Sequence, residues 1–215
     1  MTRPEPRRSF IRAEPEARRA ALIAATLELV AEAGPAAATV RAIADRAGLT
    51  QGMIRHHFSG KEALIDAAYA AHMAAQAEAI EAEVAGAGPS PRARLAAMIR
   101  ASVTPPVAEP AGLALWAGFL NMTRGSRAIR ATHEASYLSY RDRLQALLTE
   151  AREEAGRPLR APEARALAIA CNAVLDGLWL EAGALPEAFG EGEIAGLALT
   201  SVSALTGLDL SLESQ

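Results

Sequence analysis

The hydrophobic residues of the chain recur with the spacing of helices. Ile23, Leu27 and Val30 lie four and three positions apart, which places them on one face of a helix with about 3.6 residues per turn. Proline and glycine fall between such stretches, and no run alternates as a half-buried strand does. The pattern predicts an all-α protein of about nine helices, near residues 15–33, 39–47, 50–58, 59–86, 91–103, 109–122, 126–155, 162–184 and 190–206.

Local sequence signals indicate where the second, third and fourth of these helices begin. Thr39 and Thr50 are good N-cap residues, and Ser59-x-x-Glu62 has the spacing of a capping box. Gly48 suits the left-handed position of a sharp turn, and we expect the next residue, Leu49, to be a buried plug. Two short helices joined at Gly48 should therefore precede one long helix.

The charged residues are distributed unevenly along the chain. Residues 1–61 have ten basic and six acidic side chains, a charge of +4, whereas the remainder has 12 basic and 19 acidic side chains, a charge of −7. A basic segment on an acidic body suggests that the segment meets a polyanion, although a difference of a few charges also arises by chance. Residues 1–14 are expected to be a flexible basic arm that either enters a minor groove or is a solvated tail; its arginines are Arg3, Arg7, Arg8 and Arg12.

Composition limits the class of protein. Of 215 residues, 51% are hydrophobic, which excludes a disordered chain and allows a substantial core. The clean apolar stretches near residues 113–120 and 166–175 are shorter than the roughly 20 residues of a membrane span, so no membrane partner is expected. The single cysteine, Cys171, cannot form an intramolecular disulfide, which fits a reducing cytoplasm.

The segment 39–61 combines an apolar stripe with a polar, cationic face. The stripe predicted to join its two short helices consists of Val40, Ile43, Ala44, Leu49, Ile54 and Phe58. The face left outside consists of Thr50, Gln51, Gly52, Met53, Arg55 and His56. A short exposed helix with such a face fits the major groove of DNA.

The same segment resembles the helix-turn-helix of the TetR family of bacterial transcription regulators. The likeness covers residues 18–64: Arg18-Arg19, Ala24-Ala25-x-x-Glu28-Leu29, Thr39-Val40-x-x-Ile43-Ala44-x-x-Ala47-Gly48-Leu49-Thr50-x-Gly52 and His57-Phe58-x-x-Lys61-Glu62-x-Leu64. The resemblance implies a three-helix DNA-binding head at residues 15–62 and an effector-binding and dimerisation body at residues 63–215. It also implies a homodimeric repressor that binds a palindromic double-stranded DNA operator and is released by a small-molecule effector.

The resemblance also assigns roles within the head. Thr39 and Lys61, the only lysine in the chain, resemble family phosphate contacts, the alternative for Lys61 being a plain surface position. Gln51, Met53 and Arg55 are candidates for reading base edges. His57 stands where the family commonly has tyrosine, so it either donates to a phosphate, like His56, or is partly buried behind the helix. The expected DNA-binding residues are Thr39, Arg41, Thr50, Gln51, Gly52, Met53, Arg55, His56, His57 and Lys61.

The body offers aromatic side chains for a ligand pocket. Five of the nine aromatic residues are in the helices expected near residues 109–122, 126–155 and 162–184, and a carboxylate, Asp176, precedes Trp179 by about one turn. Such a set could hold a quaternary ammonium such as choline by cation–π attraction, whereas each ring by itself also fits core packing. Residues 113–117 and 175–180 resemble the BetI-like, choline-responsive branch of the family. The expected pocket residues are Trp116, Phe119, Asn121, Tyr137, Asp176 and Trp179.

The two apolar C-terminal helices stand where the family forms its dimer interface. The residues expected there are Leu167, Val174, Leu178, Ile194, Leu197, Val202 and Leu205.

An enzyme is not expected, because the sequence has no glycine-rich phosphate loop, nucleophile elbow or metal-spaced His/Cys cluster. No cofactor and no metal are expected. The alternative function is a helical ligand-binding or interaction module without sequence-specific DNA binding.

Overall fold

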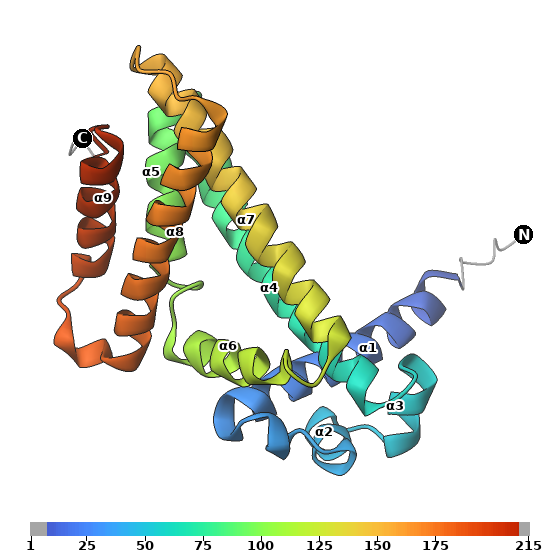
Figure 1. Ribbon diagram of the computed structural model, residues 1–215. Helices are drawn as coiled ribbons and strands as arrows, with labels where there is room; N and C mark the ends of the chain where they lie inside the picture. Colours follow the sequence, from blue (N-terminus) through green and yellow to red (C-terminus); the bar gives the residue numbers. More distant parts are fainter. Residues whose placement is uncertain (1–7, 211–215) are drawn as a thin grey trace, which may run out of the picture. The chain divides into compact units, whose positions relative to one another are not determined.

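The computed structural model describes residues 8–210, and helices account for all the regular secondary structure of that part (Figure 1). The all-α prediction is therefore confirmed. The elements are α1 Arg8–Ala33, η1 Pro35–Ala37, α2 Val40–Ala47, α3 Gln51–His57, α4 Lys61–Gly86, α5 Pro91–Ser102, α6 Pro110–Met122, α7 Arg127–Glu154, α8 Ala161–Ala184, η2 Pro186–Ala188 and α9 Glu193–Thr206.

The chain forms two compact units. The first comprises the residues up to His72 together with Ala117–Thr132, and the second comprises Met73–Trp116 together with the residues from His133 onward. Helices α4, α6 and α7 have residues in both units. The expected domain boundary between residues 62 and 63 remains a prediction.

The first unit is built around the apolar faces of α1, α2 and α3. Small side chains such as Ala25 and Ala44 allow close helix packing, and larger ones fill the centre. Leu49 is only half-buried, so it is not the buried plug that was expected. The largest fully buried side chains of this unit are Leu22, Ile43, Ile54, Leu64, Tyr69, Phe119 and Ile129.

Two helix starts differ from the expected ones. Helix α1 begins at Arg8 and runs through Pro15, so it starts earlier than the expected position near residue 15, and the flexible arm remains a prediction. The residues around Pro15 are good helix formers, and an ion pair between Arg18 and Glu14 spans one turn there. Helix α4 begins at Lys61, which leaves Ser59 too far upstream to be the N-cap. Arg3 and Arg7 lie outside the described residues.

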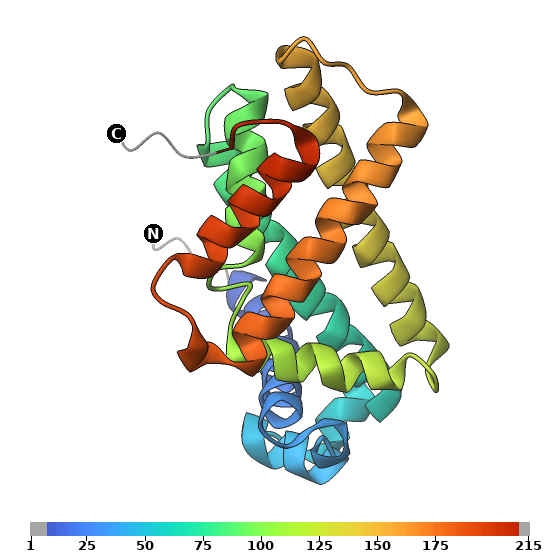
Figure 2. The ribbon, with the colours of Figure 1, turned by 60° about the vertical axis from the view of Figure 1, so that its left-hand side comes forward.

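The second unit has its own core, which α5, α8 and α9 share with parts of α4 and α7. Helices α8 and α9 lie side by side in it (Figures 1 and 2). Cys171 is fully buried in this core, and burial raises the pKa of its thiol to about 11. Its larger buried residues include Leu95, Met98, Ile99, Leu144, Leu147, Leu148, Leu175 and Val202.

Helix α8 is apolar over a longer stretch than the uninterrupted apolar residues 166–175 indicated. By length and composition it could cross a membrane, with a mean hydropathy of 1.3, which corrects the expectation that no segment is long enough. A single such helix is weak evidence, since helices of water-soluble proteins meet the same criterion. Only 22% of its apolar window is buried within the protomer, so much of the apolar surface of α8 is exposed there.

Candidate functional site

The turn between α2 and α3 is fixed by local hydrogen bonds. The Thr39 hydroxyl accepts from the Ala42 amide at 3.1 Å, which confirms the N-cap of α2. Gly48 ends α2 with a φ of 64°, the left-handed conformation that was expected. The buried side chains of Ile43, Ala44 and Ile54 hold the two short helices together. Thr50 precedes α3, but its side chain makes no cap hydrogen bond.

Four of the expected DNA-binding residues line one hollow of about 510 Å³ in the first unit. Gln51, Gly52 and Arg55 come from α3, and Lys61 comes from the first turn of α4. Gln51 and Arg55 are exposed and Lys61 is half-buried. The hollow therefore presents two cations, an amide and one carboxylate, that of Glu62, on one side of the helix-turn-helix.

The other expected contacts surround α3 without lining this hollow. Thr39, Thr50 and His56 are exposed, and Met53 is half-buried. The Arg41 side chain is 83% exposed and pairs loosely with Asp45, at 3.6 Å between Nε and Oδ2. These side chains are accessible to DNA.

His57 occupies a different environment from its neighbours. Its Nε2 atom is buried and has no hydrogen-bond partner, and its ring meets that of His56 edge to face at 5.0 Å. Desolvation lowers the pKa of His57, and the nearby cations His56, Arg18 and Arg19 lower it further. A neutral imidazole with a shielded nitrogen favours the partly buried alternative.

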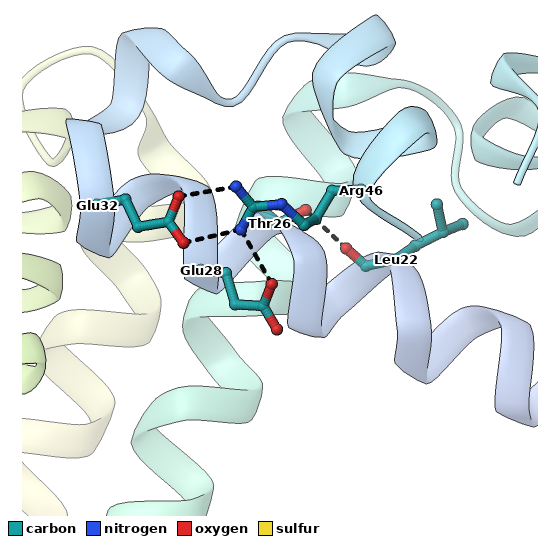
Figure 3. A network of polar contacts seen from close by, with 5 residues as sticks. All are labelled: Leu22, Thr26, Glu28, Glu32 and Arg46. Atoms are coloured by element: carbon teal, nitrogen blue, oxygen red, sulfur yellow. Dashed lines mark hydrogen bonds and ion pairs between the residues drawn. The ribbon is translucent and has the colours of Figure 1, made fainter. Parts of the chain in front are cut away.

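An ion-pair network that sequence reasoning missed ties α2 to α1 (Figure 3). The Arg46 guanidinium meets the Glu32 carboxylate through two hydrogen bonds of 2.8 and 2.7 Å, and it bonds Glu28 at 3.1 Å. The hydrogen bond from Arg46 lowers the pKa of Glu32. We call Arg46, Glu28 and Glu32 the α1–α2 clamp. The signal in the sequence was the pair of glutamates four residues apart on α1.

A pocket of about 380 Å³ lies within the second unit. Trp116, Tyr137, Asp176 and Trp179 line it as expected. The set of expected pocket residues did not include the remaining lining residues, which come from four helices and a loop that only folding brings together. They are Met73, Gln76, Ser102, Val107, His133, Ser136, Tyr140, Asn172, Leu175, Gly177 and Leu180.

Phe119 and Asn121 do not line this pocket. Phe119 is fully buried in the first unit, where its ring stacks on Tyr69 at 4.5 Å between centroids. Asn121 is exposed and belongs to the same unit. The reason is that α6 passes from one unit to the other after Trp116, which helical periodicity does not reveal.

Asp176 is the one carboxylate among the pocket-lining residues. Its Oδ2 atom accepts hydrogen bonds from the Tyr137 hydroxyl and from Asn172 Nδ2, the latter at 2.9 Å. Partial desolvation raises the pKa of Asp176, and the two hydrogen bonds oppose that rise. Desolvation and Asp176 raise the pKa of Tyr137 to about 12, so the phenol stays protonated and donates.

Three further polar side chains of the pocket are paired with protein atoms. The hydroxyls of Ser102 and Tyr140 share a hydrogen bond of 2.8 Å. Trp179 Nε1 donates to the carbonyl of Val107 at 3.1 Å. The pocket is therefore an apolar, aromatic space with a single anionic group.

The expected dimer residues separate into two sets. Leu197 and Leu205 are 41% and 45% exposed on α9, and Leu167, Val174 and Leu178 on α8 are half-buried. Ile194 and Val202 instead belong to the core of the protomer, so neither is available to a partner. Helix α9 has apolar side chains on two sides. One side packs into the core of the second unit, and the other is exposed.

A helix-turn-helix with a cationic hollow in one unit, and an apolar pocket with one carboxylate in the other, define a ligand-responsive DNA-binding regulator. Two family models match the chain. Residues 22–68 match that of the bacterial regulatory proteins of the tetR family, and residues 91–207 match that of the C-terminal part of BetI-type transcriptional repressors.

Individual relatives agree with these matches. The regulator BetI of Stenotrophomonas maltophilia is 32% identical over 167 residues, covering 76% of this chain and 80% of the relative. BetI 2 of Chromohalobacter salexigens is 32% identical over 194 residues, with coverages of 87% and 88%. The chain belongs to the TetR family of transcriptional regulators and has a BetI-type repressor body.

Solved structures show the same fold. A transcriptional regulator from Pseudomonas aeruginosa PAO1 matches with a TM-score of 0.82 and 34% identity, covering 93% of this chain and 95% of that one. A regulator from Saccharomonospora viridis in complex with choline matches with a TM-score of 0.71 and 18% identity, with coverages of 89% and 96%. Members of the family regulate transcription and are not enzymes; they bind DNA and small-molecule effectors, typically as dimers.

Proposed function

We propose that this regulator is a cytoplasmic repressor that binds a palindromic operator as a homodimer and leaves it when a small organic cation enters the pocket at Asp176. The observation that carries the DNA-binding half is the hollow shared by Gln51, Gly52, Arg55 and Lys61. The alternative, a module without sequence-specific DNA binding, gives no reason for cationic and amide side chains to gather there.

Within the DNA-binding head, residues 15–62, helix α3 contacts the edges of the bases. Gln51 can pair with adenine, Arg55 with guanine, and Met53 can touch a thymine methyl group. Thr39, Arg41, Thr50, His56 and Lys61 surround them as candidate phosphate contacts, and Gly52 allows the DNA backbone to approach closely. His57 contributes chiefly by packing behind α3.

The dimer is proposed to form through the exposed apolar side chains of α8 and α9, above all Leu197 and Leu205. A two-fold dimer presents two identical recognition helices, so its operator is palindromic with half-sites about 34–36 Å apart. The effector releases DNA if it binds more tightly to a dimer whose two heads are spaced differently.

An organic cation is the effector class that the pocket chemistry supports. Asp176 is exposed on the pocket wall and supplies a negative charge, and Trp116, Trp179, Tyr137 and Tyr140 line the same pocket with aromatic surface. The choline-bound neighbour shares the fold, which supports an organic cation as the class of effector.

The test of the DNA-binding half is selection of random duplex DNA by the purified protein at two salt concentrations. We expect a palindrome to be enriched, with affinity that falls as salt rises because phosphate contacts release counterions. Weak binding that enriches no sequence would contradict the proposal and favour the interaction module.

A further inference from the structure

We propose that the effector is a protonated primary or secondary amine attached to an apolar body larger than that of choline, rather than a quaternary ammonium. This inference rests on the proposed function, in which the pocket takes an organic cation. Three features of the pocket carry it: the pairing of Asp176, the packing of the aromatic rings, and the size of the cavity.

The first feature is the one-sided pairing of the Asp176 carboxylate. Tyr137 and Asn172 both donate to Oδ2. Because both donors use Oδ2, neither of these two hydrogen bonds occupies Oδ1, which can accept a hydrogen bond from a ligand. A carboxylate oxygen forms strong, directional hydrogen bonds with N–H donors of a cation. A quaternary ammonium has no N–H group and cannot donate to Oδ1.

The second feature is that the aromatic rings pack against one another. Trp116 and Trp179 meet edge to face, with centroids 5.7 Å apart and an interplanar angle of 75°. The ring of His133 lies against that of Tyr137 at 5.3 Å. A quaternary ammonium is held by several free ring faces around its methyl groups. Rings that cover one another offer fewer such faces, so recognition of the charge falls to Asp176.

The third feature is the cavity itself. Its volume of about 380 Å³ lies in the range of about 300–1,000 Å³ typical of drug-sized ligands, and choline is much smaller than those. Met73, Val107, Leu175 and Leu180 give its wall an apolar character. An amine with an aryl or alkyl body would bury this wall, whereas choline would leave much of it to water.

The test is a calorimetric titration of the full chain with five matched ligands: ethanolamine, choline, 2-phenylethylamine, its N,N,N-trimethyl derivative and 2-phenylethanol. We expect 2-phenylethylamine to bind most tightly, and about tenfold or more tighter than the trimethyl derivative, because only the former donates to Oδ1. Ethanolamine and choline should bind weakly.

The failures of the two proposals are distinguishable in this set. Equal or tighter binding of the trimethyl derivative, or choline binding as tightly as 2-phenylethylamine, overturns the amine inference but leaves the organic cation in place. Neutral 2-phenylethanol binding as tightly as the amine, or no binding by any of the four ammonium compounds, overturns the organic cation as well.

A pair of variants tests whether Asp176 recognises the amine. Asp176→Asn should lose the preference for 2-phenylethylamine over 2-phenylethanol while still binding the alcohol, which shows that the pocket remains folded. Asp142→Asn, an exposed aspartate on α7 that does not line the pocket, should keep the preference. An unchanged preference in Asp176→Asn would overturn the inference.

Discussion

Arg55 and Lys61 lie on the same hollow but are expected to meet different parts of the operator. Replacing Arg55 by Ala should cost about 1–3 kcal/mol of binding free energy and relax the sequence preference at one base pair per half-site. Replacing Lys61 by Ala should weaken binding to all sequences and reduce the salt dependence by about one counterion per protomer. Titrations of operator and point-mutated operators at several salt concentrations measure both effects.

The matched control for these changes uses arginines on other helices. Arg92→Ala and Arg165→Ala remove exposed cations from α5 and α8 and should leave operator binding nearly unchanged. If the Arg55→Ala and Lys61→Ala double variant kept wild-type affinity with its fold intact, the assignment of the DNA-binding surface would be wrong.

His57 makes stability depend on pH. Its pKa is lowered in the folded head by desolvation, so below the ordinary pKa of about 6.5 the unfolded chain binds more protons and stability falls. His57→Phe removes the buried, unpaired nitrogen and should reduce the loss of melting temperature between pH 7.5 and pH 5.5.

Thermal melts of the wild type and of His57→Phe at the two pH values measure this effect. Part of the pH dependence should persist, because burial also lowers the pKa of His72. A loss in His57→Phe as large as that of the wild type would show that His57 is protonated in the folded head.

At the scale of elements, the α1–α2 clamp fixes α2 on α1. Arg46→Met should lower the melting temperature modestly at low salt, and the difference from the wild type should shrink at high salt, since screening weakens exposed ion pairs. Arg41→Met, which breaks the loose pair with Asp45 within α2, is the control and should have a smaller effect. A salt-independent loss in Arg46→Met would instead indicate that packing of the arginine stem matters more than its charge.

The exposed leucines of α9 give a second prediction at this scale. Leu197→Glu should convert the dimer to a monomer, because a buried interface cannot accommodate an unpaired carboxylate. Light scattering coupled to size-exclusion chromatography measures the change. Leu138→Glu, at an equally exposed leucine of α7 (48%), should remain dimeric. A dimer in Leu197→Glu would place the interface elsewhere.

The elements also show how far sequence reasoning reaches. The helices, the Thr39 cap and the left-handed Gly48 were predictable because each depends on residues close together in sequence. Phe119, Ile194 and Val202 were misplaced because periodicity marks an apolar side chain but not whether it faces its own core, a pocket or a partner. The α1–α2 clamp and the contact between Asp176 and Tyr137 join residues far apart in the chain, so no local sequence pattern predicts them.

At the scale of the whole molecule, pocket and operator are expected to be coupled. If the effector weakens operator binding by some factor, commonly about 5–150-fold, the operator must weaken effector binding by the same factor. Calorimetric titration of the effector into the free protein and into the protein–operator complex measures the second factor. Unequal factors at equilibrium would mean that a further species, such as a larger assembly on DNA, takes part.

The single lysine has a consequence for how this protein can be handled. Apart from an N-terminal α-amine, Lys61 is the only primary amine of the chain, and it lies at the start of α4 on the hollow assigned to DNA. Amine-coupled sensor surfaces and lysine-directed dyes would therefore attach at the DNA-binding face and block it. Formaldehyde, which reacts readily with lysine amines, would in contrast cross-link Lys61 to a bound operator and so report its occupancy.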